Sequence, residues 1–177
     1  MLQLKTLLLY AILFATSILA YPGDQYDEKG KEKHCLTDRK AYDIIQRWVS
    51  FFQRGFDPAV AERTLAEDFI AQSGGLNFLS GRDATALTVT SRAQAIEEAL
   101  INTANTTNVI TVLEWFHNCD NIAFHWSLNS SPAVVLGVDY LVLERRTHRI
   151  KKNFSEFNVG AFLFNAGFPE CQAPAPT

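Results

Sequence analysis

The second half of the chain consists of apolar segments separated by very short polar turns, and this pattern restricts the fold more than any other feature. The segments are rich in Val, Ile, Phe, Trp and Leu and span residues 109–117, 121–129, 133–145 and 149–160. The turns between them span residues 118–120, 130–132 and 146–148. Strands joined by so few residues must be antiparallel neighbours, because parallel neighbours need a long crossover connection. The pattern therefore predicts a four-stranded antiparallel meander.

Helical patterns precede this meander. Three helices are predicted, over residues 37–54, 58–67 and 92–102. Thr37, Asp57 and Ser91 stand where N-caps are expected, and their side chains can accept hydrogen bonds from the first turns. Between the second and third helices, residues 69–72 suit a short strand and 73–75 a turn. Helices followed by an antiparallel sheet predict an α+β fold, with three helices packed on one face of a curved sheet of four to six strands.

The first twenty residues have the pattern of a secretory signal peptide. Lys5 gives a positive start, residues 7–15 are uninterrupted apolar residues, and cleavage after Ala20 would leave Tyr21 at the mature N-terminus. A membrane anchor is the alternative, but a span needs about 20 apolar residues and this run is shorter. No later segment is long and apolar enough to cross a bilayer. We therefore expect residues 1–20 to be removed and the protein to be secreted.

The remaining chain divides into a polar lead-in over residues 21–34, expected to be flexible, one domain over 35–168, and a Pro/Ala-rich tail over 169–177. The sequence holds 16 Lys and Arg against 19 Asp and Glu, with a pI near 5.8. This balance argues against a nucleic-acid-binding protein, which normally carries a basic surface. The one basic cluster, over residues 145–152, falls at a hairpin tip, where solvated charges are more usual than a site for an anionic partner.

Patterns that would indicate a cofactor or a metal are absent from the sequence. There is no G-x-S-x-G elbow, no H-E-x-x-H helix and no glycine-rich phosphate loop. The four histidines are scattered and no cysteines have C-x-x-C spacing, so we expect neither a metal nor an organic cofactor. In an oxidising compartment the three cysteines are expected to pair. A Cys35–Cys119 disulfide is favoured, since Cys119 lies in a predicted turn, but Cys171 in the tail could compete.

Three Asn-x-Ser/Thr triplets, at Asn105, Asn129 and Asn153, are candidate glycosylation sites in a secreted protein. A glycan must point to solvent, so the triplet at Asn153 would assign the faces of its strand. If Asn153 is glycosylated, it faces outward, and Phe154, Glu156 and Asn158 face the interior, because strand side chains alternate.

An inward Glu156 would be a candidate general acid or base, since burial raises the pKa of a carboxyl group toward neutrality. Asp139, on the preceding strand, would lie opposite residues 154–156, so the two acids could share one pocket and divide the acid and base roles. The structural alternatives are an ion pair between Glu156 and an arginine, and a position for Asp139 at a strand end or rim.

The strand over residues 121–129 has one face that is more apolar than the other. Phe124 and Trp126 share the apolar face and are expected to line the pocket. His125 is then expected to face outward, where a histidine is more often a surface or structural group than a catalytic base.

Six short motifs resemble, in this order, those of the nuclear-transport-factor-two-like proteins, which include ketosteroid isomerases, scytalone dehydratases and polyketide cyclases. They are CLTD at 35–38, AEDF at 66–69, FHNCD at 116–120, IAFHW at 122–126, GVD at 137–139 and EFN at 156–158. The resemblance covers about residues 35–168 and is strongest to small exported members from filamentous fungi. It implies a cystatin-like cone in which a bent sheet wraps around helices and leaves an apolar pocket at the open end. It also implies a polar pocket group at Asp68.

Together these features lead to three hypotheses about function. The first is a secreted, cofactor-independent isomerase, cyclase or dehydratase of secondary metabolism that acts on a small apolar metabolite, with Glu156 and Asp139 as acid and base. The second is a secreted binding protein or effector that holds such a ligand without converting it. The third is a dimerisation module: the strand over 133–143 is apolar on both faces, which suits a homodimer through the outer sheet face.

Overall fold

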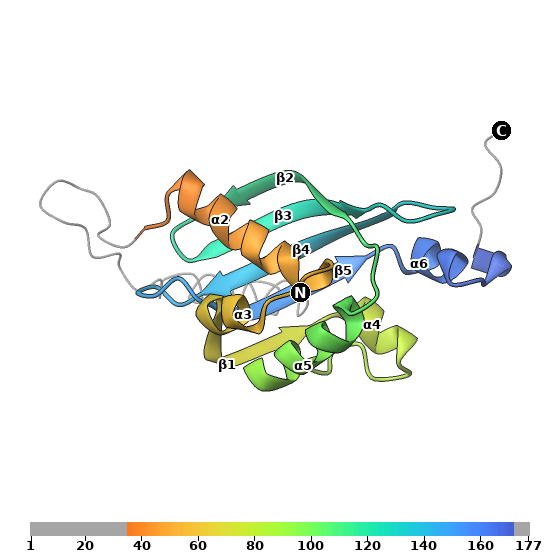
Figure 1. Cartoon of the computed structure of the whole chain (residues 1–177), viewed down its shortest axis with the longest axis horizontal. Coiled ribbons are helices and arrows are strands. Elements are labelled where there is room, and N and C mark those ends of the chain that lie inside the picture. The colour runs from red at the N-terminus through yellow and green to blue at the C-terminus, as the bar shows by residue number, and fades with distance from the viewer. Residues whose placement is uncertain (1–34, 172–177) are drawn as a thin grey trace, which may run out of the picture. The chain divides into compact units, whose positions relative to one another are not determined.

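The computed structural model describes residues 35–171 (Figure 1). The expected signal peptide, the polar lead-in and the last residues of the tail lie outside this described part of the chain. Within it, helices precede a meander of strands, so the predicted α+β class is confirmed. No helix among the described residues is long and apolar enough to cross a membrane.

The sheet has five strands, arranged in the order β1-β5-β4-β3-β2. They are β1 (Leu65–Gln72), β2 (Ile110–His117), β3 (Asn121–Leu128), β4 (Val135–Leu143) and β5 (Ile150–Phe157). The predicted meander is β2 to β5, and its neighbours are all antiparallel, as expected. The exception is β1, which pairs with β5 in parallel. A long stretch of chain separates these two strands, so no tight turn requires them to be antiparallel.

The three predicted helices are present, and their N-caps act as expected. They are α2 (Asp38–Val49), which continues into the 3₁₀ helix η1 (Ser50–Phe52), α3 (Pro58–Thr64) and α5 (Arg92–Thr103). The side chains of Thr37, Asp57 and Ser91 each accept a hydrogen bond from a backbone N–H in the first turn. Helix α3 ends earlier than predicted because the chain becomes extended at Leu65 and enters the sheet.

Two short helices, α4 (Gly74–Leu79) and α6 (Val159–Asn165), were not predicted. The sequence pattern placed a turn at the start of α4 and a strand that continued to residue 160. Polar residues cap both helices: the Ser73 side chain accepts from the N–H of Leu76, and the Asn158 side chain accepts from the N–H of Ala161. Neither helix is long enough for a helical apolar period to be recognised in the sequence. A final 3₁₀ turn, η2 (Pro169–Cys171), follows α6.

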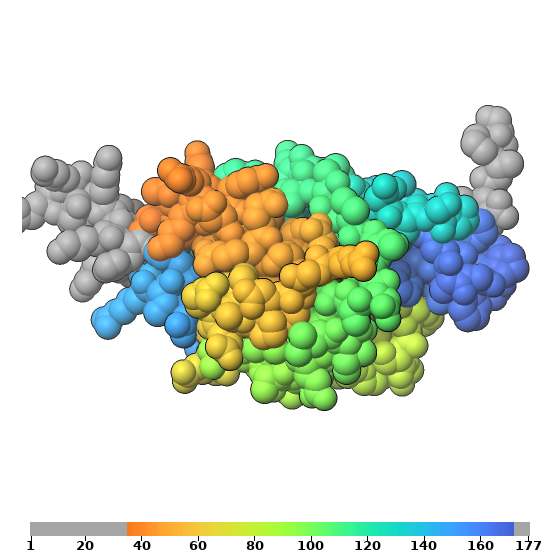
Figure 2. All heavy atoms as spheres, viewed as in Figure 1, coloured from red at the N-terminus to blue at the C-terminus, as the bar shows by residue number. Residues whose placement is uncertain are grey.

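The hydrophobic core lies between the helices and the inner face of the sheet. Helices α2, α3 and α5 lie in front of the strands in Figure 1, and their atoms cover much of this side of the domain in Figure 2. Ile44 and Ile45 of α2 pack in the same buried cluster as Phe69, Phe124 and Leu141 of the sheet. The core therefore buries the apolar stripe of α2 against the apolar side of the meander.

The Cys35–Cys119 disulfide is present and joins the start of the described chain to the turn between β2 and β3. It links residues 84 positions apart, so it holds the N-terminal end of α2 against the sheet. The competing partner, Cys171, is a free, half-buried thiol.

The outer face of the sheet carries exposed apolar side chains. Leu136, Val138 and Tyr140 of β4 alternate with buried residues, and Tyr140 pairs with Phe154 of β5. The Tyr140 and Phe154 rings lie 6.2 Å apart. Phe154 is 41% exposed. Its predicted inward position is therefore wrong.

Candidate functional site

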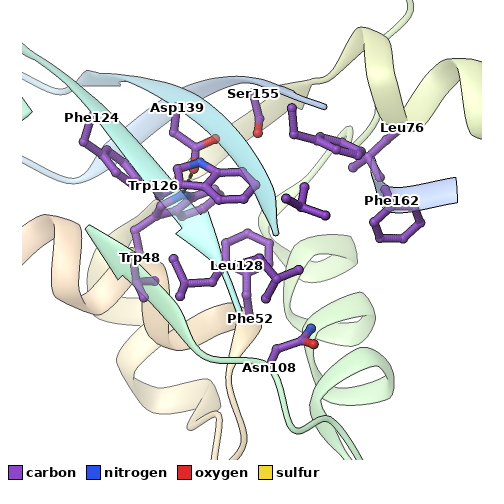
Figure 3. Close-up of a pocket in the computed structure, with 14 residues that line it drawn as sticks. Trp48, Phe52, Leu76, Asn108, Phe124, Trp126, Leu128, Asp139, Ser155 and Phe162 are labelled. Carbon is purple, nitrogen blue, oxygen red and sulfur yellow. Dashed lines mark hydrogen bonds between the residues drawn. The ribbon is translucent and has the colours of Figure 1, made fainter. Parts of the chain in front are cut away.

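A cavity of about 180 Å³ opens between α2, the inner face of the sheet and the short helices α4 and α6 (Figure 3). Fourteen residues line it: Trp48, Val49, Phe52, Leu76, Asn108, Ile110, Phe124, Trp126, Leu128, Val135, Asp139, Ser155, Phe157 and Phe162. Most of them are aromatic or aliphatic. A concave apolar cavity with a few convergent polar groups is typical of a small-molecule site. The predicted pocket positions of Phe124 and Trp126 are both found.

Asp139 is the only ionisable side chain among these fourteen lining residues of the described chain. Alternation along β4 turns it inward, and it is 4% exposed. The indole N–H of Trp48 donates a hydrogen bond of 2.7 Å to its Oδ2 atom. The Oδ1 atom is buried and forms no hydrogen bond within residues 35–171. Asp139 thus presents one bonded and one unbonded oxygen inside an apolar cavity.

Burial raises the pKa of Asp139 above its ordinary value, because the charged carboxylate loses its hydration. Four neutral polar side chains around the carboxyl group, those of Ser155, Trp48, Trp126 and Asn153, oppose this shift and lower the pKa, and Trp48 is the one whose hydrogen bond to the carboxyl group is formed within residues 35–171. The desolvation effect is the larger, because the side chain is almost completely buried, and the pKa is raised overall. A carboxyl group in this setting can exchange a proton nearer to neutral pH than a solvated aspartate can.

Trp126 forms one wall of the cavity, and its position depends on a glycine. Trp126 of β3 lies directly opposite Gly137 of β4. A Cβ atom at position 137 would overlap the indole ring, so only glycine lets the ring lie across the neighbouring strand. The indole N–H of Trp126 is buried, and it too forms no hydrogen bond to any described residue. This donor and the Asp139 Oδ1 atom are both left unbonded in the region of one cavity.

A second cavity, of about 150 Å³, lies beside the first and is more polar. Trp48, Phe52, Leu76 and Ser155 line both cavities. Asn153 lines the second, and its Nδ2 atom is buried without a hydrogen bond among the residues described. Because Ser155 pairs with Asp139 across β4 and β5, the polar groups lie where the two cavities meet. In Figure 3, Asp139 and Ser155 are seen near one another, and Asn108 lies at the opposite side of the view.

The expected inward position of Glu156 is wrong. Its Oε1 atom accepts a hydrogen bond of 2.7 Å from the N–H of Gly74, and its Oε2 atom accepts one of 3.2 Å from Gly75. Glu156 is exposed, lines neither cavity and binds the first N–H groups of α4. A carboxylate at a helix N-terminus accepts hydrogen bonds from N–H groups that have no partner within the helix, and its negative charge interacts favourably with the helix dipole. The structure thus gives Glu156 a structural contact outside the cavity.

The error in Glu156 came from the assumption about Asn153. Asn153 is 4% exposed, so its side chain faces inward and Glu156 faces the other side of β5. A glycan on Asn153 does not fit the folded domain, because the acceptor atom is buried. The other two candidate sites, Asn105 and Asn129, are exposed. On β5 the groups that face the cavities are therefore Asn153, Ser155 and Phe157.

Two further predicted pocket residues lie outside both cavities. Asp68 is on the surface and forms an ion pair of 3.0 Å with Lys151 of β5. The hydrogen bond from Lys151 lowers the pKa of Asp68, the opposite of the shift at Asp139. Asn158 is exposed and caps α6. Both side chains lie at element ends, where the sequence pattern does not distinguish a pocket group from a capping or surface group.

The histidines at positions 117, 125 and 148, within the described chain, also lie away from the cavities. His125 is half-buried and lines neither cavity, in agreement with its predicted position outside the pocket. His117 lies 3.0 Å from Asp38 at the start of α2. No group of three or more His, Cys, Asp or Glu side chains within residues 35–171 could hold a metal ion.

Three residues of the site were not recognised in the sequence. Trp48 is 5% exposed and packs in the core, but it also lines both cavities and donates a hydrogen bond to Asp139. Ser155 and Asn153 were expected to face outward. The apolar face of β3 could have indicated that Ser155 faces inward. Phe124 pairs with Asp139, and Asp139 pairs with Ser155, so all three side chains share one face of the sheet.

Comparisons with known proteins place this architecture in a family. A family model described as an NTF2-like domain, the nuclear-transport-factor-two-like family, matches residues 34–169. A search of the curated proteins returns no match.

Solved structures share the fold at low sequence identity. A SnoaL-like protein from Jannaschia sp. CCS1, provisionally assigned as a polyketide cyclase, superposes with a TM-score of 0.57 at 13% identity, covering 78% of this chain and 97% of its own. A hypothetical protein from Catenulispora acidiphila with a ketosteroid isomerase-like fold was solved in complex with trimethylamine. It has a TM-score of 0.55 at 16% identity, covering 75% of this chain and 98% of its own.

A third structure, from Kribbella flavida and provisionally assigned as a ketosteroid isomerase, has a TM-score of 0.53 at 12% identity, covering 77% of this chain and 82% of its own. At these identities the structural likeness shows the fold alone. The family match spans most of the chain. The chain belongs to the NTF2-like domain family.

Proposed function

We propose that this protein is a cofactor-independent isomerase, cyclase or dehydratase for a small, largely apolar metabolite, and that Asp139 is its general acid or base. The observation that carries the proposal is a single buried carboxyl group in an apolar cavity, with one oxygen that accepts no hydrogen bond from residues 35–171. Of the two candidate acids, Asp139 and Glu156, only Asp139 remains, since Glu156 contacts α4 instead.

One carboxyl group suffices for this chemistry. In its ionised form Asp139 can take a proton from a carbon atom and return it to another, which is an isomerisation. For a dehydration, the carboxylate takes a proton from one carbon atom and then gives it to the hydroxyl group departing from the next carbon, so that a double bond forms and water leaves. The raised pKa supports both roles, because it makes the ionised form a stronger base and keeps the acid form present at higher pH. The Trp48 N–H holds Oδ2 and leaves Oδ1 to act on a ligand.

The alternative is a non-catalytic protein or effector that only holds a ligand. One observation favours it: the cavity contains a single acid where the sequence suggested a pair. A carboxyl group among aromatic walls can recognise a polar ligand group without transferring a proton.

One experiment separates the two functions. The mature protein, wild type and Asp139→Asn, is incubated with a metabolite extract of the producing organism and analysed by mass-resolved chromatography. A product of unchanged mass, or one lighter by water, that forms with the wild type alone supports the enzyme. The matched control is Asp68→Asn, which removes a carboxylate outside both cavities. A compound retained unchanged by wild type supports the binding protein, and an active Asp139→Asn variant refutes the assigned role.

Secretion and glycosylation are part of the proposal. The apolar stretch over residues 7–15 supports export, and exposure of Asn105 and Asn129 is compatible with glycans there. N-terminal sequencing of the protein made by its own host should begin near Tyr21. The narrower relationship to exported fungal members rests on the motif resemblance.

We also propose a homodimer through the outer sheet face, supported by the exposed side chains of Leu136, Val138, Tyr140 and Phe154. Light scattering after size-exclusion chromatography should give twice the chain mass. Replacing Val138 by Lys should give the mass of one chain, because a buried lysine would lack a partner. A monomeric wild type would refute the dimer without affecting the cavity.

A further inference from the structure

We propose that the ligand of the cavity carries a substituted ammonium group, which lies against the aromatic walls and pairs with the carboxylate of Asp139. The inference rests on the proposed function, since it names the chemical class of the ligand for that same cavity. Three observations on the cavity carry it: its aromatic lining, its one acid, and the lack of a cationic side chain to balance that acid.

Aromatic rings form much of the wall. Six lining residues are aromatic: Trp48, Phe52, Phe124, Trp126, Phe157 and Phe162. They come from α2, η1, β3, β5 and α6, so they surround the space from several directions. The rings of Trp48 and Phe52 lie 5.3 Å apart, and those of Phe157 and Phe162 lie 5.6 Å apart. The negative faces of aromatic rings attract cations, and Trp does so most strongly.

The charge of the cavity also favours a cationic ligand. No Lys, Arg or His is among its lining residues, so nothing in the described cavity wall neutralises an ionised Asp139. The groups that face Asp139 are Trp48 from α2, Trp126 from β3, and Ser155 and Asn153 from β5, and none of them carries a charge. A bound cation within contact of Oδ1 would supply the missing positive charge and stabilise the carboxylate form.

An ammonium ligand also suits the proposed chemistry. The ionised form of Asp139 is the one that accepts a proton from carbon, but burial alone favours the neutral form. A cationic substrate would favour ionisation at the moment when it binds. Binding and activation of the base would then result from one contact.

The test compares two probes of the same shape. Choline has a trimethylammonium group, and 3,3-dimethylbutan-1-ol has an uncharged tert-butyl group in its place. Binding to the mature protein is measured by calorimetry, with Trp fluorescence as a second readout, because Trp48 and Trp126 line the cavity. We expect choline to bind at least about tenfold more tightly, a ratio that corresponds to about 1.4 kcal/mol. Asp139→Asn should reduce this preference to the part that the aromatic walls supply, whereas Asp68→Asn should leave it unchanged.

The pH dependence of wild-type binding gives a test that needs no variant. Choline should bind more tightly as pH rises and Asp139 loses its proton, while the affinity for the neutral alcohol should not rise. Glu98, which lines the neighbouring cavity, is the other acid to control, by Glu98→Gln.

Each other outcome overturns the inference. Equal affinities for the two probes, a preference unchanged by Asp139→Asn, or no binding of choline would each refute the ammonium class. If the alcohol binds and choline does not, the cavity still accepts small molecules and the proposed function stands. Conversion of an uncharged metabolite by the wild type alone would likewise refute the ammonium ligand and leave the proposed function standing. If the wild-type protein neither binds nor converts any compound tested, the proposed function is refuted as well.

Discussion

The two tryptophans of the cavity offer a direct measure of the hydrogen bond that holds Asp139. Trp48 and Trp126 are both buried and both line the cavity, but among the residues described only the Trp48 N–H donates a hydrogen bond, of 2.7 Å, to Oδ2. Replacing either by Phe removes an indole N–H and a similar amount of ring. The Trp48→Phe variant additionally leaves a carboxyl oxygen of Asp139 unbonded, so it should lose more stability.

The expected magnitude follows from the chemistry of the acceptor. A buried hydrogen bond to a neutral group contributes about 0.5–1.5 kcal/mol, and one to a charged group about 1.5–3 kcal/mol. The free energy of unfolding of Trp48→Phe should therefore fall below that of Trp126→Phe by about 1–3 kcal/mol. The difference should grow as pH rises, because the carboxylate accepts a stronger bond than the acid. Loss of the donor should also raise the pKa of Asp139 further.

Urea unfolding monitored by far-ultraviolet circular dichroism, at several pH values, measures the difference between the two variants. Carbon-13 labelling of aspartate side chains follows the titration of Asp139 in the same samples. Equal stabilities for the two variants would refute the assignment of the Trp48 hydrogen bond. A pKa of Asp139 that falls in Trp48→Phe would refute the reasoning about its environment.

Three further predictions concern the sheet, the disulfide and the acid. Gly137→Ala should lower the free energy of unfolding in urea by about 1–3 kcal/mol and alter the fluorescence of Trp126, because the new methyl group overlaps the indole ring. Unchanged fluorescence would contradict this prediction. Removing the disulfide by Cys35→Ser with Cys119→Ser should lower the free energy of unfolding by about 4–5 kcal/mol, because the bond closes a loop of 84 residues. An unchanged melting temperature would contradict this prediction. The pKa of Asp139 in the folded protein lies above its ordinary value of 3.8, so the contribution of Asp139 to stability should fall as pH rises from 3.8 through the folded pKa. The stability of Asp139→Asn should not show this fall, and identical pH profiles for the two proteins would contradict the burial effect.

Local signals in the sequence predicted the secondary structure well where they were complete. Thr37, Asp57 and Ser91 begin helices at the expected positions, because a capping side chain acts within its own turn. The short turns of the meander likewise require antiparallel neighbours. The helices α4 and α6 were missed because their caps stand before runs too short to show a helical period.

The candidate site was predicted in part, and the error has a definite origin. On β3 the contrast between Phe124 and Trp126 and their neighbours identified the inner face correctly. On β5 both faces hold polar and apolar residues, so composition could not decide, and the glycosylation triplet at Asn153 was used instead. A change of parity by one residue moves every side chain to the other face. The error of one residue therefore placed Glu156 in the predicted pocket, where the structure has Ser155.

By itself the sequence determined the fold class, the meander, three helix starts and the inward face of β3, because each depends on residues close together in the chain. The tertiary structure decided which acid is buried, what it binds and where the cavities lie. Asp139 meets Trp48 across 91 positions of sequence, and Glu156 meets Gly74 across 82. Such contacts depend on how β1 pairs with β5 and how α2 packs on the sheet, and no local pattern encodes those distances. The chemistry of this protein therefore depends on its long-range packing, whereas its architecture can be read from short-range signals.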